Sequence, residues 1–238
     1  ILMEQGYKTI AISYTNNDYG KGLADSIEAN FKAAGGTVTL NASHEDGKGD
    51  YGAEVGALAQ AGGDILVVAG YLNDGGKGII MSSLDTGAFD MFYLPDGMIG
   101  DQLPIDIGPD LDGSIGAVPG TDSPGAASFA EMASGAGFKA GPFAPESYDA
   151  AALIMLAMQA AGSTDSNVFK DHVMNVANAP GEKIFPGDLG KAIDLIKAGK
   201  DVDFVGASAV ELIGPGESAG NYRQILVDGG KITTVQFR

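Results

Sequence analysis

The first half of the chain alternates short apolar runs with stretches whose hydrophobic residues recur at helical spacing. The apolar runs are bounded by turn residues and predict five strands, at residues 9–14, 37–40, 64–69, 90–94 and 114–118. The helical spacing predicts helices between them, at residues 19–34, 51–61 and 77–84, each followed by glycine. Because strands and helices alternate, right-handed crossovers favour a doubly wound parallel sheet, and the predicted fold class is α/β.

The alternation stops at residues 119–125, where turn-forming residues cluster, and we expect a boundary there. Beyond it, the pattern predicts four helices, at residues 126–134, 145–161, 167–178 and 188–198. Extended segments are expected only at residues 202–205, 210–213, 222–227 and 231–236, the last two as a hairpin. The four helices therefore have no sheet of their own, and we expect that sheet to belong to sequence preceding Ile1.

Composition narrows the range of partners. The chain has 238 residues and a formal net charge of −17, from 31 acidic and 14 basic side chains. This balance repels phosphate backbones and anionic lipids, so we expect no nucleic acid partner. The longest apolar run, residues 150–161, is shorter than the ~20 residues that a membrane span needs. With no cysteine and two isolated histidines, His44 and His172, we expect neither disulfides nor a metal site.

Four segments resemble cofactor-binding or catalytic motifs, and each departs from the pattern that the chemistry needs. A dinucleotide-binding loop requires a small residue where Asp25 stands, and a phosphate-binding loop requires glycine at Tyr71. A calcium loop through 106–113 would put its bidentate glutamate at Pro119, and the segment 206–210 lacks the final glycine of a nucleophile elbow. We therefore expect no cofactor and no catalytic residue.

Aromatic or acidic residues follow three of the predicted strands: Tyr19 the first, Tyr71 the third and Asp96 the fourth. Open α/β sheets bind ligands outside the carboxyl ends of their strands, so these residues should gather at one edge. Asp96 would accept charge-assisted hydrogen bonds from an ammonium group, and the two phenols would cover and orient it. Each residue alone also fits a structural role: a ring packed on a helix start, a loop aromatic, and a turn former before Gly97.

Several segments together resemble the branched-chain amino acid binding proteins of bacterial ABC transporters. They are Asn17–Ala24, Gly70-Tyr71 and Tyr148–Ala151, with further likeness in 181–187 and 201–208, so that the resemblance covers essentially the whole chain. The Asp-Tyr-Gly-x-Gly signal after a strand is fairly specific. The resemblance implies the type I periplasmic binding protein fold, in which two α/β lobes joined by three crossing segments close around an amino acid.

The resemblance also implies a division of the chain. Residues 1–120 with 221–238 would form the C-terminal ligand-binding lobe, and residues 121–220 the helical part of a truncated N-terminal lobe. It places Tyr19 and Tyr71 beside the ligand, and Asp96 against the ligand's amino group, where glutamate is common. Tyr148 matches an aromatic position near the cleft, or alternatively a capping-turn tyrosine. The serine and threonine that grip the ligand's carboxylate in this family are expected in the absent part.

The leading hypothesis is a non-enzymatic periplasmic receptor that presents an amino acid to the membrane permease of an ABC transporter by hinge closure. A second hypothesis makes the chain the ligand-sensing core of a regulator or receptor of the same fold. An enzyme is a third hypothesis, motivated only by the sheet and the lone carboxylate of Asp96. The sequence leaves the identity of the amino acid open.

Overall fold

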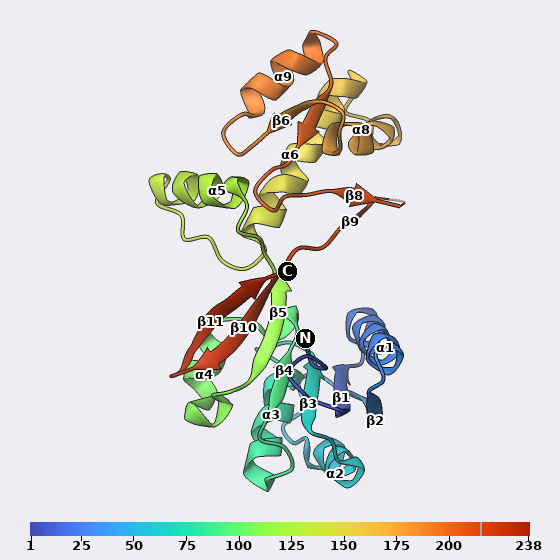
Figure 1. The fold of residues 1–238 in the computed structure, drawn as a ribbon, viewed down its shortest axis with the longest axis vertical. Coiled ribbons are helices and arrows are strands. Elements are labelled where there is room, and N and C mark those ends of the chain that lie inside the picture. Colours follow the sequence, from blue (N-terminus) through green and yellow to red (C-terminus); the bar gives the residue numbers. More distant parts are fainter. Residues whose placement is uncertain (215) are drawn as a thin grey trace. The chain divides into compact units, whose positions relative to one another are not determined.

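The computed structural model describes residues 1–214 and 216–238 and divides into two compact units (Figure 1). The first unit contains residues 1–118 and 224–236, and the second contains residues 119–223 and 237–238. The chain passes between them at 118–119, 223–224 and 236–237, so the units are linked by three peptide connections.

The first unit is built on a seven-stranded sheet with the order β11-β10-β5-β4-β3-β1-β2. The five strands of the first half pair in parallel: β1 (Thr9–Thr15), β2 (Thr37–His44), β3 (Ile65–Ala69), β4 (Phe92–Leu94) and β5 (Ile115–Pro119). The hairpin of β10 (Tyr222–Asp228) and β11 (Lys231–Phe237) completes the sheet. The backbone of Val227 bonds to both Gly113 and Ser114 beside β5. The predicted α/β class with a doubly wound parallel sheet is confirmed.

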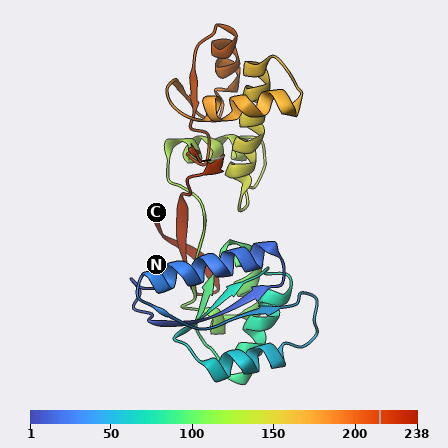
Figure 2. The same ribbon diagram turned by 90° about the vertical axis from the view of Figure 1, so that its right-hand side faces the viewer.

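Helices cover both faces of this sheet, as Figure 2 shows for α1 in blue and α2 in a lighter blue. They are α1 (Asp18–Ala33), α2 (Gly52–Ala61), α3 (Gly75–Thr86) and α4 (Gln102–Ile107), with short 3₁₀ turns η1 (Asp96–Met98) and η2 (Pro109–Leu111). Alternate strand residues separate the two cores: Ile10 and Ile12 pack with Phe31 of α1, whereas Ala11 packs with Leu58 of α2. The segment 96–111 carried no helical signal in the sequence, because its turns are too short to show a period.

The glycine after Tyr19 has a packing role in place of a phosphate-binding one. Asn17 caps α1, with its Oδ1 accepting a hydrogen bond from the Gly20 amide at 2.9 Å. A Cβ atom at Gly20 would lie 2.2 Å from the Thr15 carbonyl oxygen, so only glycine allows the helix to start this close to the end of β1. Tyr19 is thereby fixed in the first turn of α1.

The second unit is mostly helical. Its helices are α5 (Pro124–Gly135), α6 (Ala144–Ala161), α7 (Ser166–Phe169), η3 (Lys170–His172), α8 (Val173–Ala177) and α9 (Leu189–Lys197). Its strands are β6 (Glu182–Ile184), β7 (Val202–Phe204), β8 (Leu212–Ile213) and β9 (Glu217–Ser218). Leu156 of α6 packs with Val176, Ile184 and Phe204 in one core. Among the described residues, no helix combines the length and apolar character needed to cross a membrane.

Two expectations for this unit are wrong. The helix predicted at 167–178 is interrupted at η3, and the pattern could not reveal this because Phe169, Val173 and Val176 keep helical spacing across the tightened turn. The helices also have a small sheet of their own, since β6 pairs in parallel with β7. Strand β6 was missed because only Ile184 of its three residues is apolar and buried.

A buried carboxylate holds the end of the second unit's last parallel strand against α6. Asp149 is 2% exposed, its Oδ1 accepts from the Ala207 amide at 2.7 Å, and its Oδ2 accepts from the Ser208 amide and hydroxyl at 2.7 and 2.6 Å. Burial raises the pKa of Asp149, and the donors of Ala207 and Ser208 oppose that rise. Gly206 has φ +63°, and a Cβ there would lie 2.3 Å from the carboxylate. Gly206 therefore leaves room for the Asp149 carboxylate, and the carboxylate accepts the hydrogen bonds of the turn.

Replacing Asp149 by alanine should lower the free energy of unfolding by about 2–3 kcal/mol, because it leaves the donors of the 207–208 turn without an acceptor. Urea denaturation followed by circular dichroism measures the change. The matched control is Asp194→Ala, at an exposed position of α9, which should change stability by less than about 0.5 kcal/mol. Equal midpoints for the two variants would contradict a structural role for Asp149.

Candidate functional site

The structure brings Tyr19, Tyr71 and Asp96 together at the carboxyl edge of the sheet in the first unit. Strand β3 pairs with β1 on one side and β4 on the other, so the loops that follow these three strands are neighbours. The rings of Tyr19 and Tyr71 stack with centroids 5.2 Å apart and planes 24° apart. The Tyr19 hydroxyl donates to Oδ1 of Asp96 at 2.7 Å. Three residues far apart in sequence thus form one contiguous group.

The backbone of two loops supports this group. The Gly97 amide donates to the Tyr19 hydroxyl at 3.2 Å, and the Leu72 amide donates to the Gly97 carbonyl at 3.0 Å. A Cβ atom at Gly97 would lie 2.4 Å from the Gly70 carbonyl and 2.7 Å from the Tyr19 hydroxyl. Glycine is therefore required at 97 for the loop after β4 to approach the loop after β3.

The electrostatics of the group favour a cationic guest. Burial raises the pKa of Tyr19, and the hydrogen bond to Asp96 raises it further, so the phenol stays a donor throughout the physiological range. That donor occupies Oδ1 of Asp96, whereas Oδ2 has no hydrogen-bond partner among the described residues. Tyr71 is 37% exposed. An acceptor oxygen beside an accessible aromatic ring suits an ammonium group, through a charge-assisted hydrogen bond and a cation–π contact.

Tyr148 lies in the second unit, in the first half of α6. Its ring centroid is 5.4 Å from that of Phe129, and burial raises the pKa of its phenol. It lines an apolar pocket of about 430 Å³ together with other aromatic and aliphatic side chains, among them Phe129, Phe138 and Phe143. The ligand-binding role of Tyr148 stays a prediction.

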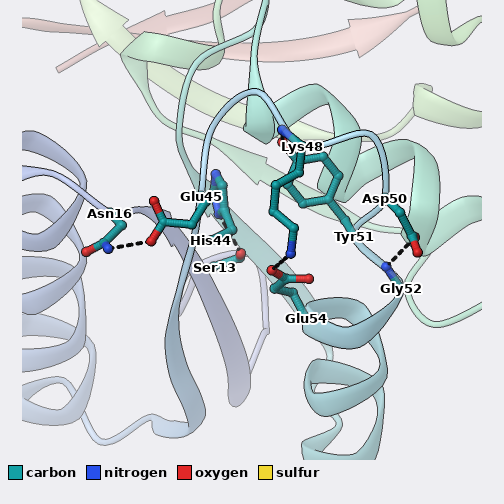
Figure 3. Close-up of polar contacts among 9 residues, drawn as sticks. All are labelled: Ser13, Asn16, His44, Glu45, Lys48, Asp50, Tyr51, Gly52 and Glu54. Atoms are coloured by element: carbon teal, nitrogen blue, oxygen red, sulfur yellow. Dashed lines mark hydrogen bonds and ion pairs between the residues drawn. The ribbon is translucent and has the colours of Figure 1, made fainter.

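A second polar group near the same edge of the first unit was not foreseen from the sequence (Figure 3). Figure 3 shows His44, at the end of β2, pointing toward Ser13 of β1, with Glu45, Lys48, Tyr51 and Glu54 around it. No local motif signals this group, because the pairing of Ser13 with His44 depends on the register of β1 against β2. Among the described residues, no cluster of three or more His, Cys, Asp or Glu side chains is arranged to hold a metal ion.

Comparison with known proteins identifies the family. A sequence profile described as periplasmic binding protein matches residues 1–190, and the chain belongs to that family. It is 30% identical over 159 residues to Leu/Ile/Val-binding protein homolog 1 of Brucella suis, covering 66% of the chain and 42% of the relative. It is 29% identical over 186 residues to Leu/Ile/Val-binding protein homolog 2 of Brucella abortus, covering 76% of the chain and 48% of the relative. The matched part is therefore under half the length of these relatives.

One shorter match comes from a sensory system. The chain is 35% identical over 91 residues to the chemotactic signal transduction system substrate-binding protein BasB of Halobacterium salinarum. That match covers 37% of the chain and 22% of the relative.

Solved structures share the fold at lower identity. The leucine binding protein LivK from Thermotoga maritima has a TM-score of 0.77 and 18% identity, covering 99% of this chain and 62% of that one. The substrate binding protein LivJ from Streptococcus pneumoniae, in complex with isoleucine, has a TM-score of 0.72 and 18% identity, covering 100% and 61%. A solute binding protein from R. palustris in complex with benzoate has a TM-score of 0.67 and 17% identity, covering 99% and 60%. The resemblance to the branched-chain amino acid type of periplasmic binding protein is confirmed, and these relatives are solute-binding proteins, not enzymes.

Substituting Tyr19 by phenylalanine should lower the free energy of unfolding by about 1–2 kcal/mol, because it removes the donor to Asp96 and leaves the Gly97 amide without its acceptor. Urea denaturation measures the loss. Tyr222→Phe is the control, since Tyr222 is 47% exposed and should change stability by less than about 0.5 kcal/mol. A Tyr19→Phe variant as stable as this control would show that the Tyr19 hydroxyl does not join the two loops.

Proposed function

We propose that the chain is the ligand-binding portion of a periplasmic receptor that captures an α-amino acid and delivers it to the permease of an ABC transporter. The single observation that carries this proposal is the convergence of Tyr19, Tyr71 and Asp96 at the carboxyl edge of the parallel sheet. Membership of the periplasmic binding protein family supports the receptor class and its location.

The charge of Asp96 favours an amine-bearing ligand over a simple carboxylate. Benzoate occupies one structural relative, but an unpartnered carboxylate oxygen at the site would repel such an anion. An α-amino acid brings an ammonium group to that oxygen, while its own carboxylate needs more donors than these three residues supply. A branched aliphatic side chain is favoured by the ligands named for the Brucella relatives and for LivJ.

Hinge closure completes the proposed mechanism. In this proposal, residues 1–120 with 221–238 form one lobe, and residues 121–220 belong to the other, which includes Tyr148. Three chain connections between two compact units are compatible with a hinge, because a few residues in each connection can absorb the rotation. The ligand binds the closed state better than the open one and so shifts the population toward closure. The permease then recognises the closed receptor. No enzymatic step and no cofactor are part of the proposal.

A second candidate is a sensory receptor that reports an amino acid to a signalling partner, and the likeness to BasB favours it. Ligand capture would be the same in both cases, so the partner distinguishes them. Deleting the gene should abolish uptake of the radiolabelled amino acid if the protein serves a transporter. Loss of the behavioural response to that amino acid with unchanged uptake would favour the sensory role.

Replacing Asp96 by asparagine in the full-length protein should weaken binding of L-leucine, L-isoleucine or L-valine by ~2–5 kcal/mol, because an amide cannot compensate a desolvated ammonium group. Isothermal titration calorimetry measures the affinity. Binding of 4-methylpentanoate, which is leucine without its amine, should not weaken in the same variant.

The matched control for this test is Asp110→Asn, an exposed carboxylate of η2, which should leave affinity unchanged. Unchanged affinity for the amino acids in Asp96→Asn would remove Asp96 from the site. Absence of binding heat with any amino acid in the unaltered protein would reject the proposed ligand class.

A further inference from the structure

His44 is a buried histidine with an unsatisfied ring nitrogen. The side chain is 1% exposed, its Nδ1 lies 2.9 Å from the Ser13 hydroxyl, and its Nε2 has no hydrogen-bond partner among the described residues. Most polar atoms in protein interiors are hydrogen-bonded, so an orphaned nitrogen at this position calls for an explanation.

The imidazole ring packs against the loop that carries Tyr71. A Cβ atom at Gly70 would lie 3.1 Å from Nε2 of His44, and one at Gly75 would lie 2.7 Å from its Cδ2. The backbone on both sides of Tyr71 thus rests directly on the ring. On its far side the same loop is tied to Gly97, through the Leu72 amide. The loop therefore connects His44 to the segment that holds Asp96.

Four carboxylates act on His44. Glu45 and Asp46 follow it in the chain, Glu54 comes from α2, and Asp74 precedes α3. Two of them also join the Tyr71 loop to the loop after β2: Asp46 accepts from the Gly75 amide at 3.1 Å, and Asp74 accepts from the Gly47 amide at 2.6 Å.

The other charged and titratable groups at this position are Lys48, which forms an ion pair with Glu54 at 2.5 Å, and Tyr51, whose ring meets the imidazole edge-on at 6.2 Å (Figure 3). Oε2 of Glu54 is buried and also has no partner among the described residues. Lys48 is thus already paired with a carboxylate, and the other charged side chains that act on His44 are acidic.

These surroundings set opposing influences on the charge of His44. Burial lowers the pKa of its imidazole, and the carboxylates of Asp46, Glu54 and Asp74 partly offset this effect. The folded state disfavours the imidazolium cation. The fold therefore has its full stability above the ordinary imidazole pKa of about 6.5, where the ring is neutral whether or not the chain is folded, and it loses stability as the pH falls below that value.

We propose that His44 is a positioning residue for the Tyr71 loop and couples proton uptake to the conformation of that loop. The cation carries an N–H at both nitrogens. The one at Nδ1 donates to Ser13, whereas the one at Nε2 faces the Gly70 backbone without an acceptor. Movement of the loop lets a carboxylate such as Asp46 or water reach Nε2, and it carries Tyr71 away from Tyr19. If the amino acid site proposed above is right, ligand affinity falls on acidification.

The coupling is tested directly by NMR titration of the chain between pH 8 and 5, without ligand. With two histidines in the sequence, the ring signals of His44 are assigned by comparison with His172→Gln. We expect the amide signals of Gly70, Tyr71 and Gly75 to shift with the same midpoint as the His44 ring. They should stop shifting in His44→Gln and continue in His172→Gln. Loop amide signals that do not shift as His44 ionises would overturn the proposal.

A second variant keeps the test decisive if His44→Gln fails to fold. Ser13→Ala retains the imidazole but removes the partner of Nδ1, so the titration midpoint of His44 should change. The midpoints of the loop amides should change by the same amount. Midpoints that separate in this variant would also overturn the coupling.

The consequence for binding is measured by calorimetry with L-leucine at pH 7.5 and 5.0. We expect the affinity of the full-length protein to fall on the order of tenfold at the lower pH, and that of His44→Gln to stay nearly constant. Equal pH dependence in both proteins would contradict the role of His44. Absence of leucine binding at either pH would reject the proposed function alone, since the loop titration is read without ligand.

Discussion

The parallel pairing of β3 with β1 on one side and β4 on the other is the constraint on which the candidate site depends. It places three loops at one edge, and each loop contributes one residue to the site: Tyr19, Tyr71 or Asp96. The hydrogen bond from Tyr19 to Asp96 and the stacking of Tyr19 on Tyr71 follow from that placement. Glycine at 97 permits the loops to approach, since any side chain there would collide with the Gly70 carbonyl. The site thus depends on the order of the strands in the sheet as much as on the chemistry of the three side chains.

Much of the first unit could be predicted from the sequence because its signals are local. Continuous apolar runs such as 65–69 indicate buried strands, and glycines after each helix mark where the chain turns back. The convergence of Tyr19, Tyr71 and Asp96 followed from the rule that parallel strands present their carboxyl ends at one edge. What could not be predicted depends on contacts between distant residues. The pairing of Ser13 with His44 requires the exact register of two strands, and β6 exists only through its pairing with β7.

The two units differ in how fully the polar side chains of these key residues are hydrogen-bonded. In the second unit the carboxylate of Asp149 is fully engaged by the backbone and hydroxyl of the 207–208 turn, and its role is to hold that turn. In the first unit Asp96 is engaged through one oxygen, and His44 through one nitrogen. A polar group with all its hydrogen bonds formed stabilises a structure. One at a sheet edge with an unused donor or acceptor can still bind a ligand or a proton. This difference separates scaffold from candidate site.

The stacked phenols also give the protein a built-in optical probe. The sequence contains eight tyrosines and no tryptophan, so phenols dominate its near-ultraviolet absorption and emission. Two rings held 5.2 Å apart at a fixed angle interact electronically, and their contribution to near-ultraviolet circular dichroism depends on that geometry. Occupancy of the sheet edge can therefore be followed by spectroscopy on the unlabelled chain, with no reporter dye attached.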